Sequence, residues 1–215
     1  MYSKRISLVM IAMWASIALC CYGQTPAGWH TYHNPDYGFS IAYPASFTLT
    51  YTSSVVAGSV KETGNDLDHP GYGCQPTSLV CFEYKQPTFS RAGIFGIGVT
   101  VNLHESSTEV ECHQLDEGDH LADMTKTARI NGIAFHSGDT SEGWTVHSVG
   151  MTKYRVFRRN VCFEIETAEG MYDFAPEEDD YHAPDARVLH RIHRDQESIV
   201  HSFAFTDPRS RRLRP

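Results

Sequence analysis

Histidine is the residue type whose number and spacing come closest to a chemical site in this sequence. The chain holds 12 histidines among 215 residues, and His190 and His193 stand three positions apart in a segment with helical periodicity. This spacing places both imidazoles on one side of a helix, where they can bind one metal ion. His182 precedes them. Because no acidic partner is fixed by spacing, as it is in the His-Glu-x-x-His zinc pattern, surface histidines are the simpler interpretation.

An acidic run from Glu177 to Asp180 is the second candidate site. Carboxylate oxygens are the ligands that calcium prefers, but the run lacks the alternating spacing and the glycine of an EF-hand loop. A solvated loop is therefore the simpler interpretation, and no cofactor is expected. Calcium or zinc stays open as an alternative through these candidate ligands: Glu177, Asp180, His182, His190 and His193.

No nucleophilic site is visible in the sequence. The Gly-x-Ser-x-Gly pattern of serine hydrolases does not occur. Cys112 and His113 are adjacent, so on a helix their side chains point about 100° apart and cannot pair. We expect a protein that is not an enzyme, and the competing hypothesis is a metal-dependent hydrolase that uses a histidine and carboxylate site.

The first residues have the three-part layout of a secretory signal. Lys4 and Arg5 give a positive start, the stretch 6–19 carries no charge, and Gly23 provides a small residue for cleavage. The apolar stretch is shorter than the roughly 20 residues of a membrane span. An uncleaved anchor and lipidation at Cys20 are the alternatives. We predict cleavage near Gly23, no membrane segment afterwards, and a secreted or periplasmic protein.

The cysteines fit that destination. Of the six cysteines in the chain, Cys20 and Cys21 lie in the predicted signal. The other four cysteines are an even number, which predicts two disulfides with three possible connectivities. In one possible pairing, the first disulfide closes a local loop and the second joins a helix to a strand. The disulfide candidates, in the order of that pairing, are Cys74 with Cys81 and Cys112 with Cys162.

Composition and charge limit the possible partners. Hydrophobic residues make up 41% of the chain and charged residues 20%, which is typical of a globular protein. The net charge of −8 argues against nucleic acid. We predict a signal at 1–23, a single domain at 24–207, and a basic, unstructured tail at 208–215.

The hydrophobic pattern predicts many strands and few helices. Alternating side chains predict strands in the ranges 37–43, 97–103 and 161–167, and Asn131-Gly132 predicts a tight hairpin turn. Further strands are expected at 29–32, 47–51, 78–84, 126–130, 133–136, 144–151, 154–158 and 202–206.

Two helices are expected. Ser106 with Glu109 has the pattern of a capping box ahead of a short helix that reaches Leu115. Asp185 can cap a closing helix, with apolar residues on one side and arginines on the other. The sum is an α+β fold, with a central antiparallel sheet of about seven strands flanked by helices. The apolar side of the closing helix comprises Val188, Leu189, Ile192, Ile199 and Val200, and the other side Arg187, Arg191 and Arg194.

The order of these motifs resembles that of the PsbP-like domains. The stretch from Asp36 to Pro44, Asp-Tyr-Gly-Phe-Ser-Ile-Ala-Tyr-Pro, resembles their opening strand, and the stretches 130–135, 154–157 and 161–165 are similar to secreted bacterial members. The resemblance implies a PsbP-like sandwich that acts as a non-catalytic binding or accessory domain. Its partner would be an unknown protein or small ligand outside the cytoplasm. No motif here matches the metal-binding residues of the photosynthetic members, so a photosynthetic role is not implied.

Overall fold

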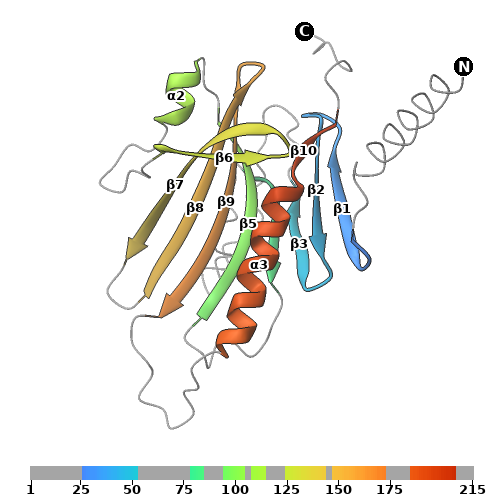
Figure 1. Cartoon of the computed structure of the whole chain (residues 1–215), viewed down its shortest axis with the longest axis vertical. Helices are drawn as coiled ribbons and strands as arrows, with labels where there is room; N and C mark the ends of the chain where they lie inside the picture. Colours follow the sequence, from blue (N-terminus) through green and yellow to red (C-terminus); the bar gives the residue numbers. More distant parts are fainter. Residues whose placement is uncertain are drawn as a thin grey trace, which may run out of the picture.

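The computed structural model describes residues 26–52, 78–84, 94–104, 108–114, 124–143, 147–172 and 185–206. These ranges form two antiparallel sheets and two helices (Figure 1). The large sheet has seven strands in the order β3-β4-β5-β9-β8-β7-β6, and the small sheet has three in the order β1-β2-β10. The elements are β1 Trp29–Asn34, β2 Phe39–Pro44, β3 Phe47–Thr52, β4 Ser78–Tyr84, β5 Ile94–His104, α2 Glu109–His113, β6 Lys126–Ile130, β7 Ile133–Gly143, β8 His147–Arg158, β9 Val161–Tyr172, α3 Ala186–Ser202 and β10 Ala204–Phe205.

Tight turns fix the register of the large sheet. Asn131 and Gly132 join β6 to β7 with φ angles of 47° and 80°, the left-handed conformations that a type I′ turn requires. The Asn131 amide also donates hydrogen bonds to the carbonyls of His201 at 3.2 Å and Phe203 at 2.7 Å. The predicted turn therefore also ties the large sheet to the end of α3.

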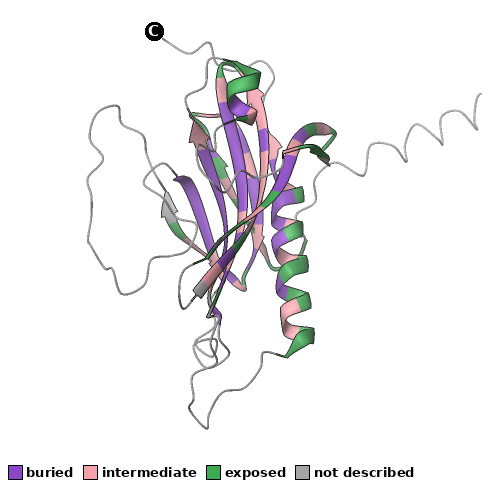
Figure 2. Cartoon of the chain, turned by 90° about the vertical axis from the view of Figure 1, so that its left-hand side faces the viewer, coloured by how far each residue is buried: buried purple, intermediate pink, exposed green. Residues whose placement is uncertain are grey.

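Helix α3 lies along one face of the large sheet (Figure 2). Asp185 caps its first turn by accepting a hydrogen bond from the Arg187 amide at 2.8 Å. The buried Gln196 side chain donates to the backbone carbonyls of Gly98 and Ala168 at 3.0 and 3.3 Å. As predicted, the apolar side of the helix faces inward and its arginines face solvent.

The hydrophobic core lies between α3, the small sheet and one face of the large sheet. Phe39 stacks on Phe203 with ring centroids 5.2 Å apart, and Phe135 meets Phe203 edge to face at 6.0 Å. Ile165 from β9 and Ile199 from α3 belong to the same buried cluster. Burial of this apolar surface supplies the main driving force for the fold.

The predicted α+β fold with a central antiparallel sheet of about seven strands is confirmed. Three details of the prediction were wrong. The small sheet was not foreseen. The two strands predicted at 144–151 and 154–158 are one continuous strand, β8, because the pairing with β9 runs without a break along its whole length. The capping box uses Thr108 with Glu111, because this pair satisfies the same pattern as Ser106 with Glu109 two residues later.

Several predictions concern segments beyond the described residues. The signal, the acidic run and the basic tail belong to this group. None of the helices in the described ranges is long and apolar enough to cross a membrane.

Candidate functional site

A row of polar side chains crosses the large sheet on the face that turns away from α3. Each residue is the direct cross-strand partner of the next, one from each of five neighbouring strands. Directly paired residues point to the same side of a sheet. The row, called the polar row below, comprises Ser78 in β4, Asn102 in β5, Glu164 in β9, Arg155 in β8 and His136 in β7.

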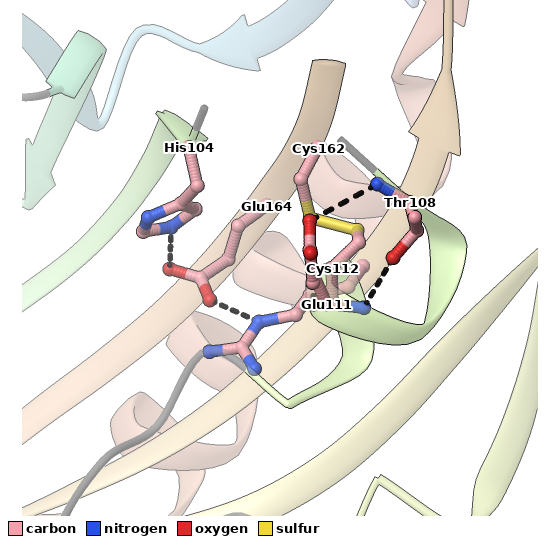
Figure 3. Close-up of a disulfide and its surroundings, with 7 residues drawn as sticks. His104, Thr108, Glu111, Cys112, Cys162 and Glu164 are labelled. Atoms are coloured by element: carbon pink, nitrogen blue, oxygen red, sulfur yellow. Dashed lines mark hydrogen bonds and ion pairs between the residues drawn. A yellow bond between two sulfur atoms is a disulfide. The ribbon is translucent and has the colours of Figure 1, made fainter. Parts of the chain in front are cut away.

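Hydrogen bonds connect most of the polar row. The Ser78 hydroxyl donates to Asn102 Oδ1 at 2.7 Å, and Asn102 Nδ2 donates to Glu164 Oε1 at 3.2 Å. Arg155 Nε donates to Glu164 Oε2 at 2.6 Å. His104 Nε2 lies 3.3 Å from Glu164 Oε1 and so adds a second basic group to this carboxylate (Figure 3).

The charged members of the polar row are buried. Glu164 is 2% exposed and Arg155 is 1% exposed. Burial of an unpaired charge is very costly, so such groups persist only when they are paired and hydrogen-bonded. Alternation in β9 puts Phe163 and Ile165 on the core face and Glu164 on the opposite face. Strand β9 is therefore buried on both of its faces.

The surroundings of Glu164 hold it ionised. Burial alone would raise the pKa of this carboxyl group. The contact with His104 and the positive charges of Arg155, His104 and Lys153 outweigh burial and lower the pKa from 4.5 to about 2. In the next residue pair on the same face of the sheet, Lys153 Nζ lies 3.8 Å from Glu166 Oε2.

Helix α2 is fastened to the same face of the sheet. Cys112 in α2 and Cys162 in β9 form a disulfide with Cα atoms 5.3 Å apart (Figure 3), the helix-to-strand pairing considered in the sequence analysis. The Thr108 hydroxyl accepts a hydrogen bond from the Glu111 amide, and the Glu111 carboxylate accepts one from the Thr108 amide, both at 3.1 Å. Cys81 is also in a disulfide. Its pairing with Cys74 stays a prediction, since Cys74 lies outside the described residues.

Where α2 meets β7, three possible metal ligands come together. Glu109 and His113 lie four residues apart on α2, and His136 belongs to β7. Their donor atoms all lie within 4.8 Å of one another. The rings of His113 and His136 have centroids 3.7 Å apart and planes tilted by 36°. This group, called the α2–β7 cluster below, stands at the His136 end of the polar row.

The environment of His113 leaves its ring incompletely satisfied. Its Nε2 atom is buried and has no hydrogen-bond partner within the described part of the chain. The pKa of His113 is lowered, mainly by burial and then by His136 and Arg155, while Glu109 opposes the change. Buried polar atoms in folded proteins are normally hydrogen-bonded. The unpaired nitrogen of His113 therefore points to a ligand that would supply the missing interaction.

The histidines considered as candidate ligands from their spacing lie elsewhere. His190 and His193 are exposed on α3, and His193 Nε2 contacts Glu169 Oε2 at 2.7 Å. Among the residues that the structure describes, neither belongs to a group of three donors within reach of one ion. His182, Glu177 and Asp180 lie outside the described residues, so a site there stays a prediction.

The α2–β7 cluster was not among the sites predicted from the sequence. Glu109 and His113 have the spacing that puts two ligands on one face of a helix, and that signal was available in the sequence. His136 gave no such signal, because it is brought to α2 only by the pairing of β7 within the sheet and by the disulfide.

Comparison with known proteins finds likeness in fold. No family model and no curated protein sequence matches this chain. LpqN of Mycobacterium tuberculosis, described as involved in cell envelope biogenesis, matches at 11% identity and a TM-score of 0.45, over 83% of this chain and 91% of LpqN. The cyanobacterial PsbP of Synechocystis matches at 11% identity and a TM-score of 0.40, over 86% and 96% of the two chains.

A third structure is the Ran-binding protein Mog1p of Saccharomyces cerevisiae. It matches at 11% identity and a TM-score of 0.42, over 83% of this chain and 96% of Mog1p. At such low identity the likeness concerns the fold and says nothing of function.

The depressed pKa of Glu164 predicts a specific loss of stability in acid. The carboxylate stabilises the folded state fully above pH 4.5, and this contribution disappears as the pH falls toward 2. At 1.36 kcal/mol for each pKa unit, the loss is on the order of 3 kcal/mol. In Glu164→Gln this titration is absent. The variant should be less stable at pH 7, and its deficit relative to wild type should shrink by about 3 kcal/mol between pH 5 and pH 2.

Urea unfolding followed by circular dichroism at several pH values measures this difference. Glu169→Gln is the matched control, since Glu169 lies in the same strand but contacts the exposed His193; it should follow the wild-type curve. A deficit for Glu164→Gln that stays constant down to pH 2 would contradict the assignment.

Proposed function

We propose that this protein acts outside the cytoplasm, secreted or in the periplasm, as a non-catalytic binding or accessory domain. The observation that carries the proposal is the Cys112–Cys162 disulfide, because structural disulfides persist in oxidising compartments and are rare in the cytosol. The export signal predicted over residues 1–23 supports the same destination.

The polar row supports a binding role over a catalytic one. General acid–base catalysis near neutral pH needs a group whose pKa lies near that pH. Glu164 is instead held ionised by Arg155 and His104, with a pKa of about 2. We assign these charged groups to holding β5, β8 and β9 in register. The proposed ligand is an extracytoplasmic protein or small molecule. The chain's net charge of −8 disfavours nucleic acid.

A metal-dependent hydrolase is the second candidate, and one observation favours it. The α2–β7 cluster offers two imidazoles and a carboxylate, the ligand set of several catalytic zinc sites. Such a site would leave a coordination position for water, and the metal would lower the pKa of that water.

Export and oxidation can be tested together. The full-length chain, expressed with its own N-terminus in a Gram-negative host, should accumulate in the periplasm with Gln24 as its first residue. In urea without reductant, the protein should show no thiols that react with maleimide, and reduction should expose the cysteines. A cytosolic product that retains Met1 and is alkylated at Cys112 and Cys162 would overturn the extracytoplasmic assignment.

The absence of catalysis is tested on the same purified protein. We expect the protein with added zinc to hydrolyse chromogenic ester, phosphoester and peptide substrates no faster than zinc in buffer. His136→Ala serves as the matched control. Turnover that depends on zinc and disappears in His136→Ala would refute the non-catalytic role and establish the hydrolase.

A further inference from the structure

We propose that Glu109, His113 and His136 form a binding site for one divalent first-row transition-metal ion, for which zinc is the appropriate probe. The proposal goes beyond the binding role inferred above. None of these residues is among the ligand candidates predicted from the sequence, and the proposal stands on the geometry of the α2–β7 cluster.

The donor set selects the class of metal. Two imidazole nitrogens and one carboxylate oxygen are typical ligands of zinc and neighbouring transition metals. Calcium and magnesium instead require mostly oxygen ligands. The cluster brings one oxygen donor together with two nitrogen donors, so its chemistry favours a transition metal.

The spacing of the donors is close to that of a bound state. Their mutual distances lie within 4.8 Å, whereas ligands about 2.1 Å from a tetrahedral zinc ion lie roughly 3.4 Å apart. Glu109 is exposed at the surface of α2, so its side chain can swing toward the histidines without disturbing packing. The buried His113 Nε2, which lacks a partner among the described residues, would gain one in the ion.

The two elements that carry the ligands are held in place independently of any metal. His136 sits in the interior of the sheet, paired with Thr127 on one side and Arg155 on the other. Helix α2 is fixed by its capping box and by the Cys112–Cys162 disulfide. Ligands on rigid supports lose little conformational entropy on binding, which favours affinity.

The charge near the cluster is compatible with a cation. Arg155 is the nearby basic residue, but its Nε donates to the Glu164 carboxylate at 2.6 Å. Its positive charge is thus largely compensated within the polar row. Glu109 adds a negative charge at the site itself, which attracts a divalent ion.

Titration calorimetry with zinc chloride tests the proposal. The protein is purified without a histidine tag, with its disulfides intact, and is stripped with a chelator. We expect a site with one zinc per chain. His113→Ala or His136→Ala should weaken binding by about 100-fold or more, and Glu109→Gln by about 10-fold.

His190→Ala and His193→Ala are the matched controls. Both remove exposed histidines from α3, and both should leave the affinity unchanged. Circular dichroism with chelator present verifies that each variant is folded. Because the Glu109 side chain is exposed, Glu109→Gln tests the site even if a histidine variant unfolds. Cobalt absorption gives a second readout, since its visible bands should weaken in the same variants.

Three results would overturn the proposal. These are the absence of stoichiometric binding to the folded wild-type protein, an affinity unchanged in Glu109→Gln and in the folded histidine variants, and a loss of affinity confined to His190→Ala or His193→Ala. None of these results bears on export or on the disulfide, so failure of the metal site is distinguishable from failure of the proposed function.

Discussion

The disulfide between Cys112 and Cys162 is the constraint on which the functional interpretation depends. Helix α2 has only five residues, and isolated helices of that length are not stable in water. The covalent bond to β9 keeps the helix on the sheet. As a consequence, Glu109 and His113 stay beside His136. The same bond carries the proposal of an oxidising compartment, so one interaction underlies both the proposed metal site and the proposed location.

The polar row is a second constraint on the position of strand β9. Cys162 and Glu164 lie two residues apart in β9 and therefore point to the same face. The carboxylate of Glu164 accepts hydrogen bonds from Arg155 and Asn102 and contacts His104, all from neighbouring strands. A buried ion pair contributes little stability over an apolar replacement, but loss of one partner is strongly destabilising. The row thus favours one register of β5, β9 and β8, and with it one position for the disulfide.

Local patterns in the sequence predicted the elements well. Asn131-Gly132 encodes its turn because both residues tolerate positive φ, and Asp185 encodes the start of α3 because its side chain accepts a hydrogen bond from a helix amide. Prediction fails where two overlapping stretches fit the same motif. Ser106 with Glu109 and Thr108 with Glu111 both have the spacing of a capping box, and the structure uses the second pair. The pairing of distant strands is not a local property. The small sheet and the placement of His136 next to α2 therefore could not be derived from spacing.

Hydrogen exchange of the α2 backbone tests the central claim most directly. Amides of Cys112 and Gln114, which donate to Thr108 and Glu111 within the helix, should exchange slowly in the oxidised wild-type protein. In the double variant Cys112→Ser with Cys162→Ser, the account predicts that these amides lose protection while those of β5, β8 and β9 keep theirs. Equal protection of the α2 amides in both proteins would show that the helix is held without the disulfide and would contradict the account.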